Sequence, residues 1–292
     1  MSENTEKQGF NIDGSLIVVT GGNSGIGRET ARKLSLSGAS VLLACRDMDK
    51  ALAAKKDIEG ESENPVRIMQ LDLSSFDSIR KFADKLIEKY GVPDVLINNA
   101  GVYSRKHKKS ADGIELTMAV NYFGTFYLTS LLLPGMLELA NEVRIVNVTS
   151  DSYRVGAFLP DLGESAKLCG FKAYAVSKRA LMYYTFELAK KLKGSNVTVN
   201  CVHPGHSVTG IWPSDVWYWK LAKPLISLNA DPASYAAQNV VYTASSSELD
   251  GLTGKYISDL SITQPVKKVM SEEEQVNLWQ FTISKLEKLG VL

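Results

Sequence analysis

Short apolar runs rich in β-branched residues alternate with longer amphipathic segments, and this alternation limits the folds open to the chain more than any other feature. Six runs have the length and composition of buried strands: 15–20, 40–45, 66–71, 94–99, 143–149 and 196–202. Residues 76–90 repeat apolar side chains at three- and four-residue spacing and stop at Gly91, which predicts a helix. Continuous apolar strands joined by helices predict an α/β fold, a doubly wound parallel sheet with helices on both faces.

No repeat, low-complexity linker or break in composition divides the 292 residues, so we expect one domain, 1–292. We expect its core at about 12–260, a variable lid at about 206–230, and a helical C-terminal tail at about 265–292. The net charge of +1 argues against a dedicated nucleic-acid binder. The three cysteines are far apart and form no CxxC pair, so we expect no metal site and no disulfide framework.

The amino terminus is polar, and no apolar run reaches the length of a membrane span. These two features predict a cytoplasmic protein that is neither secreted nor membrane-spanning.

The loop after the first predicted strand reads TGGNSGIG, residues 20–27. In a doubly wound sheet, ligands bind beyond the carboxyl ends of the strands. Glycine allows the backbone to turn tightly and approach a pyrophosphate, and the helix that follows offers unpaired N–H groups. The loop is therefore more typical of a Rossmann-fold nucleotide site than of a structural turn. The expected cofactor contacts in it are Gly21, Asn23, Ser24, Gly25, Ile26 and Gly27.

The residues after the second predicted strand distinguish the two nicotinamide dinucleotides. An NAD(H) site usually offers a carboxylate there to the ribose 2′-hydroxyl. This chain has Arg46, whose planar guanidinium matches a phosphate, so NADP(H) is preferred. Asp47 follows and leaves NAD(H) open, although it could instead be the N-cap of the next helix.

The sequence YAVSK places Tyr174 and Lys178 four residues apart, on one face of a predicted helix. A tyrosine with an ordinary pKa of about 10 is a poor proton donor and acceptor at neutral pH, and a neighbouring cation lowers that pKa. The pair therefore predicts a general acid. An isolated pair of this kind would normally be two side chains on a solvated helix, but the glycine-rich loop favours catalysis.

The chain resembles the short-chain dehydrogenase/reductase family over roughly residues 12–260. It carries TGGNSGIG, LDL, NNAG, VNYFG, NVTS, YAVSK and HPG in the family's order. Its glycine pattern, TGxxxGxG, also argues against the nucleotide-sugar epimerase branch. The segments ACRD and NNAGV, with the long interval between Ser150 and Tyr174, resemble the retinol dehydrogenase-like reductases.

The resemblance implies roles for the catalytic candidates. Tyr174 would transfer the proton, and Lys178 would activate the phenol and contact the nicotinamide ribose. Ser150 would hold the substrate oxygen, with Thr149 and Ser152 as nearby competitors.

The resemblance also implies the rest of the site. Asn121 would support a water-linked proton relay. Asn98 would line the cofactor, or it could only brace neighbouring strands. The other implied cofactor contacts are Asp72, Leu73, Ala100, Gly101, Pro204, Gly205 and Thr209. His203 and His206 match no role in the family.

Together these residues imply an oxidoreductase that uses NADPH and a small apolar carbonyl or alcohol substrate, such as a retinoid-like aldehyde or ketone. The alternative is a dinucleotide-binding interaction protein with vestigial reductase activity. The helix expected at 174–192 could pack against its twin in a homodimer, or its apolar face could be core.

The stretch IWPSDVWYWK, residues 211–220, holds three of the four tryptophans and lies in the expected lid. We expect Trp212 and Trp217 to contact the apolar substrate. The basic run at 105–109 should lie near the same sheet edge, where it is by default a solvated charge run. Tryptophans beside a basic cluster also suit peripheral contact with an anionic membrane.

Overall fold

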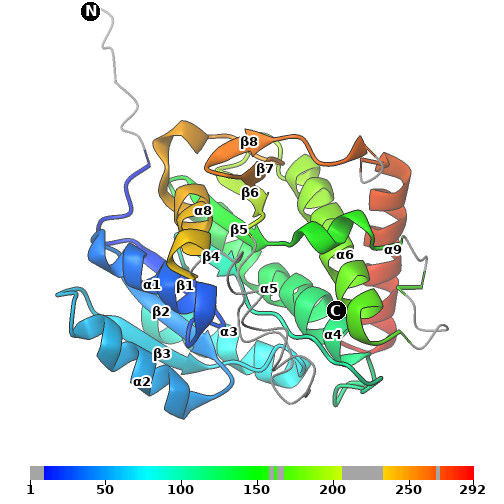
Figure 1. The fold of residues 1–292 in the computed structure, drawn as a ribbon, viewed down its shortest axis with the longest axis horizontal. Coiled ribbons are helices and arrows are strands. Elements are labelled where there is room, and N and C mark those ends of the chain that lie inside the picture. The colour runs from blue at the N-terminus through cyan, green and yellow to red at the C-terminus, as the bar shows by residue number, and fades with distance from the viewer. Residues whose placement is uncertain (1–9, 158–160, 163–167, 206–232, 268–269) are drawn as a thin grey trace, which may run out of the picture.

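The computed structural model describes residues 10–157, 161–162, 168–205, 233–267 and 270–292. A central sheet lies between two layers of helices (Figure 1). The strands are β1 (Leu16–Thr20), β2 (Ser40–Cys45), β3 (Val66–Gln70), β4 (Val95–Asn98), β5 (Val143–Val148), β6 (Val197–Val202), β7 (Tyr256–Ser258) and β8 (Ser261–Thr263). The helices are α1 (Gly25–Leu36), α2 (Met48–Glu59), α3 (Phe76–Tyr90), α4 (Leu116–Met118), α5 (Gly124–Glu138), α6 (Gly170–Lys191), α8 (Ala233–Ser245) and α9 (Glu272–Lys288). Short turns η1 (Ala119–Phe123), η2 (Asp151–Arg154) and η3 (Ser247–Leu249) complete them.

The sheet has the order β3-β2-β1-β4-β5-β6-β7-β8. Every neighbouring pair is parallel except β7 and β8. The chain runs outward from β1 to β3, then crosses to β4 and runs outward in the other direction, so the order reverses between β1 and β4. This reversal creates the crevice where doubly wound sheets bind ligands, and it confirms the predicted fold class.

Each face of the sheet carries its own apolar core, because successive side chains of a strand point to opposite faces. Val18, Leu42 and Leu96 face α3, α5 and α6. Ile17 and Val19 belong to the other core, with residues of α1, α2 and α8. Alternation of the strand side chains therefore explains why helices cover both faces.

Helix α3 matches the predicted helix in both bounds. The Ser75 side chain accepts a hydrogen bond from Ser78 N at its start. Gly91 ends it with a φ of 86°, a conformation that glycine adopts without strain.

Residues 116–138 form one continuous helical run through α4, η1 and α5, and among the described residues this run alone has the length and apolarity of a membrane span. Within the structure, however, 78% of its apolar window is buried. A β-carbon at Gly124 would overlap the Leu73 carbonyl, so the run packs directly on the chain that follows β3. It therefore has the packing of a core element.

Helix α9 packs over α6 on the outer side of the molecule (Figure 1). Trp279 of α9 stacks on Tyr184 of α6 with ring centroids 6.0 Å apart, and Thr282 shares a 2.7 Å hydrogen bond with Tyr122. The predicted C-terminal helix is therefore present. Because α9 covers α6, the apolar face of α6 is core, and the predicted homodimer could not use the surface beneath α9 without displacing that helix.

Candidate active site

The glycine-rich loop joins β1 to α1 at the point where the strand order reverses. Thr20, the last residue of β1, ties the loop to the chain after β4. Its hydroxyl donates to the Ile97 carbonyl over 3.3 Å and accepts from the backbone N–H groups of Asn99 and Ala100 over 3.0 Å each. Ser24 is the N-cap of α1, but its side chain makes no cap hydrogen bond. The amino end of α1 therefore presents backbone donors without a side-chain cap, as a pyrophosphate site requires.

The glycines of this loop lie where a β-carbon would strain the backbone or overlap a neighbouring atom. Gly21 and Gly25 have φ values of 66° and 53°, which side chains with a β-carbon rarely adopt. A β-carbon at Gly27 would overlap the side-chain amide of Asn99, and that amide donates to the Thr20 carbonyl over 2.8 Å. The backbone is therefore held in a tight cradle of the kind that the predicted cofactor needs.

Arg46 and Asp47 take different positions after β2. Arg46 is exposed at the carboxyl end of the strand. Asp47 is the N-cap of α2: its carboxylate accepts from Lys50 N over 3.1 Å and forms an ion pair with the Lys50 ammonium at 2.9 Å. Of the two roles predicted for Asp47, the structure shows the cap, so this carboxylate already has partners while Arg46 faces solvent.

Asp72 and Leu73, two of the implied cofactor contacts, lie in the chain that follows β3. The Asp72 carboxylate accepts from the backbone N–H and the hydroxyl of Ser74, at 2.9 and 2.6 Å. The Leu73 side chain is buried in the core, so only its backbone could meet an adenine ring.

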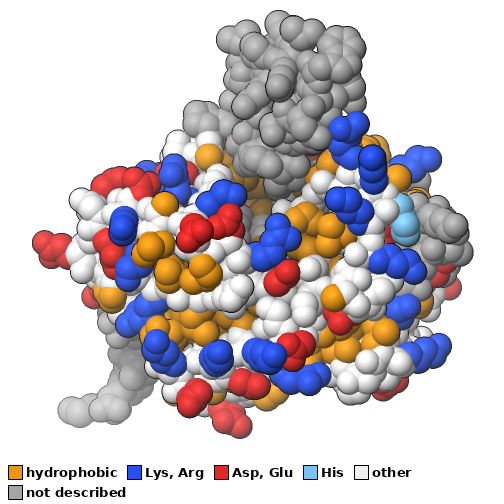
Figure 2. All heavy atoms as spheres, turned by 90° about the horizontal axis from the view of Figure 1, so that it is seen from below, with side chains coloured by type: hydrophobic (Ala, Val, Ile, Leu, Met, Phe, Trp, Pro, Cys, Tyr) orange, Lys and Arg blue, Asp and Glu red, His pale blue; other side chains and the backbone are white. Residues whose placement is uncertain are grey.

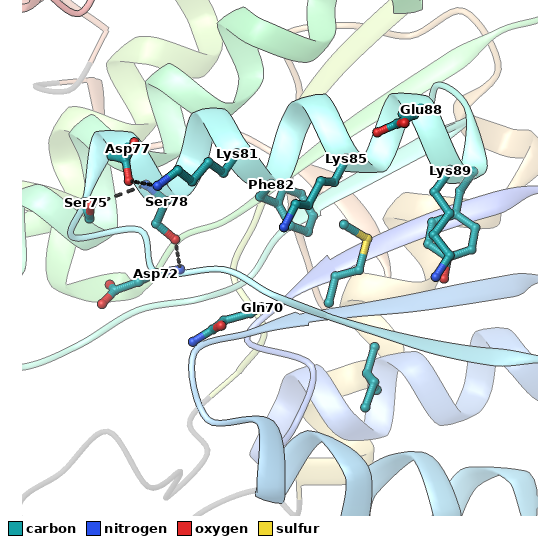
Figure 3. A pocket seen from close by; sticks show the side chains of 13 residues that line it. Gln70, Asp72, Ser75, Asp77, Ser78, Lys81, Phe82, Lys85, Glu88 and Lys89 are labelled. Carbon is teal, nitrogen blue, oxygen red and sulfur yellow. Dashed lines mark hydrogen bonds and ion pairs between the residues drawn. The ribbon is translucent and has the colours of Figure 1, made fainter.

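A cavity of about 830 Å³ lies between β3 and α3, and Asp72 stands at one end of it (Figure 3). Figure 3 shows Lys85 and Phe82 side by side on α3, on the side that faces β3. None of the catalytic candidates lines this cavity. It belongs to the outer edge of the sheet, away from Tyr174.

Asn98 is a brace inside the core. Its side-chain amide donates to Asn147 Oδ1 over 2.9 Å and to the Thr129 hydroxyl over 3.3 Å, and Asn147 in turn donates to the Thr185 hydroxyl over 2.9 Å. This buried network links β4, β5, α5 and α6. The structure therefore gives the Asn98 side chain the bracing role that the sequence left open, whereas Ala100 and Gly101 lie further along, at the sheet edge.

Tyr174 and Ser150 meet at the carboxyl edge of the sheet. Tyr174 lies in the first turns of α6, and Ser150 follows β5; the Ser150 hydroxyl lies close enough to Tyr174 to influence the pKa of its phenol. Of the two competitors, Thr149 donates its hydroxyl to the Lys178 carbonyl over 3.3 Å, and the Ser152 hydroxyl is buried with no partner among the described residues. Ser150 is thus the hydroxyl that the fold brings to Tyr174.

The predicted lowering of the Tyr174 pKa by Lys178 was wrong for the structure described. Burial raises the pKa of Tyr174, and the hydrogen bond from Ser150 only partly opposes that rise. The Lys178 ammonium lies 5.7 Å from the centroid of the Tyr174 ring and donates to the Val148 carbonyl over 2.8 Å. The ammonium is therefore tied to β5 rather than to the phenol.

Lys178 itself is only 3% exposed. Burial lowers the pKa of its ammonium to about 8. A β-carbon at Gly101 would lie 3.7 Å from this ammonium and 3.5 Å from Asn121 Oδ1. Gly101 therefore lies directly beside the buried cation, and a β-carbon there would be in van der Waals contact with it.

Asn121 lies in the π-helical turn η1, a geometry often found at functional sites. Its side chain accepts from Val102 N over 2.8 Å and donates to Val102 O over 3.1 Å and to the Ser177 hydroxyl over 3.0 Å. Asn121 therefore fixes the chain just after Gly101 against α6, on the inner side of the Lys178 ammonium.

The chain after β6 closes the described part of the site. Pro204 is buried, and Gly205 has a φ of 105°. His203 is buried, with its imidazole Nε2 3.9 Å from the Asp151 carboxylate. Thr209, Trp212, Trp217 and the rest of the predicted lid lie outside the described residues.

Thr20 and Tyr103, which the sequence prediction did not single out, contribute to the site, and Asn99, which lies within the range 98–101 predicted to line the cofactor, has a structural role. Thr20 and Asn99 hold the glycine-rich loop against β4, and only their proximity across the strand reversal could have indicated this role. Tyr103 is half-buried, with its ring centroid 6.2 Å from that of Tyr174. Its position in the loop after NNAG was the available signal.

The basic run 105–109 is exposed beside the start of α6, where His107 Nδ1 lies 3.0 Å from the Leu168 carbonyl. On the face shown in Figure 2, lysines and arginines are interspersed with aspartates, glutamates and apolar patches. That face therefore carries mixed charge rather than a field of one sign.

The chain belongs to the short chain dehydrogenase family, whose model matches residues 15–216. It is an NAD(P)-dependent oxidoreductase that acts on alcohol or carbonyl groups, of the retinol dehydrogenase-like branch. It is 40% identical to human retinol dehydrogenase 13 over 277 residues, which cover 92% of this chain and 83% of that protein. It is 36% identical to mouse retinol dehydrogenase 12 over 285 residues, which cover 96% of this chain and 88% of the relative.

Solved structures share the fold. The crystal structure of an uncharacterized protein from Mycobacterium Paratuberculosis has a TM-score of 0.74 and 30% identity, and the match covers 95% of each chain. A blue fluorescent protein from a metagenomic library, solved in complex with NADPH, has a TM-score of 0.66 and 27% identity over 85% of this chain and 97% of that one. The family and the fold together establish a nicotinamide cofactor for this chain.

Proposed function

We propose that this chain uses NADPH to interconvert apolar aldehydes or ketones and their alcohols, with retinal as the substrate to test first. The observation that carries the proposal is that the fold brings Ser150, Tyr174 and the buried ammonium of Lys178 together at one edge of the sheet. Relatives named retinol dehydrogenases support the substrate class.

The described residues fit the cofactor. The start of α1, which has no side-chain cap, and the tight glycine loop suit a pyrophosphate. The buried Lys178 ammonium beside Gly101 suits a ribose. Arg46 is exposed where a 2′-phosphate would lie, whereas the carboxylate of the adjacent Asp47 caps α2. This arrangement favours NADPH over NADH. When bound, NADPH supplies the hydride.

Tyr174 moves the proton. In reduction its hydroxyl donates to the substrate oxygen, and in oxidation the phenolate accepts the alcohol proton. Because burial raises the pKa of Tyr174, the phenol is protonated at neutral pH, which is the state that reduction needs. Oxidation should therefore speed up as the pH rises, while reduction should not.

Ser150 and Lys178 orient the reactants. The Ser150 hydroxyl lies beside that of Tyr174, so a carbonyl oxygen placed between them would have two donors. Lys178 places a cation beside Gly101, where it would hold the ribose hydroxyls. Asn121 keeps the neighbouring backbone in place.

The test measures consumption of NADPH and of NADH by the purified chain with all-trans-retinal and with a saturated aldehyde of similar length. We expect turnover with NADPH, and loss of at least ~10²-fold in Tyr174→Phe with NADPH binding retained. Tyr235→Phe is the matched control, because Tyr235 is an exposed tyrosine. Activity of Tyr174→Phe within a few-fold of wild type would contradict the mechanism. NADPH binding without turnover of any aldehyde would favour the dinucleotide-binding interaction protein.

A further inference from the structure

Arg179 directly follows Lys178 on α6, but its side chain leaves the helix on a different side. It is only 4% exposed. A buried guanidinium is stable only when its donors are paired. Those of Arg179 bond the Gly156 carbonyl at 2.7 Å, the Tyr183 hydroxyl at 3.1 and 2.7 Å, and the Glu274 carboxylate at 3.2 Å.

The bond to Gly156 holds the segment that carries Ser150. A β-carbon at Gly156 would overlap the Ala175 carbonyl, so this segment lies directly on the backbone of α6, one residue beyond Tyr174. Gly156 N donates to the Ser152 carbonyl over 3.2 Å, and Ser152 N donates to the Ser150 hydroxyl over 3.3 Å. The segment therefore meets α6 at both ends, with Ser150 at Tyr174 and Gly156 at Arg179.

The counter-ion of Arg179 comes from the C-terminal helix. Glu274 lies in the first turn of α9, where its backbone N–H donates to the Ser271 hydroxyl over 3.2 Å. Its carboxylate accepts from both Arg179 and the Tyr183 hydroxyl. Helix α9 thus neutralises the buried cation that holds the Ser150 segment.

We infer that Arg179, neutralised by Glu274 of α9, is a positioning residue that holds the Ser150 segment against α6, with Ser150 beside Tyr174. This inference rests on the proposed function, because it assigns Arg179 an effect on catalysis through the Ser150–Tyr174 pair. It also makes the C-terminal helix part of the machinery that aligns the site, although α9 lies on the outer side of α6 (Figure 1).

The test uses Arg179→Met and Glu274→Gln in the full chain. Among the described residues, Ser150, Tyr103 and Lys178 lie near the Tyr174 ring, and of these Ser150 opposes the rise in the Tyr174 pKa. If Arg179 holds Ser150 in place, both variants raise the Tyr174 pKa, and the pH profile of alcohol oxidation moves to higher pH. We expect kcat to fall about tenfold in Arg179→Met, as misplacement of a reacting group predicts, and less in Glu274→Gln. KM for NADPH should change less than about twofold, since the glycine-rich loop is untouched.

The matched control is Lys190→Met. Lys190 also joins α6 to α9, through a 3.6 Å ion pair with Glu272, but it lies away from the Ser150 segment. It should lower stability without moving kcat or the pH profile. A Lys190→Met profile that shifts like that of Glu274→Gln would show that general loosening of α9 causes the effect, and would overturn the inference.

A further readout and the second variant keep the result decisive. The Tyr174 phenol can be titrated by NMR in ¹³C-tyrosine-labelled protein, with its signal assigned by its loss in Tyr174→Phe. The titration reports the contact between Ser150 and Tyr174 even if no substrate is turned over. Failure of the proposed function and failure of this inference are therefore distinguished. If Arg179→Met does not fold, Glu274→Gln decides: an unchanged Tyr174 titration and an unchanged kcat in that variant would overturn the inference.

Discussion

Replacing Lys178 with methionine should make the protein more stable and inactive at the same time. The ammonium is 3% exposed, and within the described part of the chain it donates to a neutral carbonyl, that of Val148. Burial without a carboxylate partner lowers the pKa of Lys178 from 10.5 to about 8. Each pH unit corresponds to about 1.4 kcal/mol, so the folded protein disfavours the charged form by about 3 kcal/mol. Methionine has a similar length and no charge, so it should recover most of this free energy.

The difference in unfolding free energy between Lys178→Met and wild type should depend on pH. The Lys178 pKa is lower in the folded chain than in the unfolded chain, so the unfolded chain binds the extra proton between about pH 8 and 10.5. The destabilisation is therefore fully present below pH 8 and disappears as the pH rises through that window. Lys178→Met should exceed wild type in unfolding free energy by about 2–3 kcal/mol at pH 7, and the difference should close near pH 10.5.

The assay is urea unfolding followed by tryptophan fluorescence, at pH 7 and at pH 10, with cofactor removed. Lys172→Met is the control, because Lys172 is an exposed lysine of the same helix; it should change stability by less than about 0.5 kcal/mol. A Lys178→Met variant that is less stable than wild type at pH 7, or a difference that does not depend on pH, would refute the reasoning.

Other changes separate cofactor contacts from structural ones. Arg46→Ala should weaken NADPH binding by about 1.5–3 kcal/mol, measured by titration calorimetry, and barely affect NADH; equal losses for both would show a structural role. Asn98→Ala should lower the unfolding free energy by about 1–3 kcal/mol, because it leaves buried Asn147 without a donor, and should leave NADPH affinity unchanged. A selective loss of NADPH affinity would make Asn98 a cofactor contact instead. Gly101→Ala should fold normally but raise KM for NADPH, since its β-carbon enters the space 3.7 Å from the Lys178 ammonium; an unchanged KM would mean that the cofactor lies elsewhere.

The features that could be predicted from the sequence are those carried by local periodicity. The six long strands and helix α3 repeat their apolar residues at the spacing of a strand or a helix, and each appears where that spacing predicts it. Strands β7 and β8 have three residues each, too few for any period to show, so they were missed.

The electrostatics of the site could not be predicted in the same way. The spacing of Tyr174 and Lys178 places them on one helix face, but spacing does not give burial, and burial is what raises one pKa and lowers the other. The same limit applies to Asn98, because its partners Asn147 and Thr129 come from β5 and α5. Only the fold decides whether that amide braces strands or faces a ligand.

Two consecutive cations of α6 are buried, and the fold treats them in opposite ways. Arg179 is matched by Glu274, so its charge is neutralised and its hydrogen bonds serve to hold the Ser150 segment. Lys178 forms no ion pair with a carboxylate among the described residues, and its ammonium lies beside Gly101. A carboxylate beside Lys178 would stabilise the folded chain, but it would also repel the phosphates of the cofactor and compete for the ammonium. The uncompensated charge is therefore best explained as a cost in stability that is retained for binding, whereas Arg179 is paired with a carboxylate.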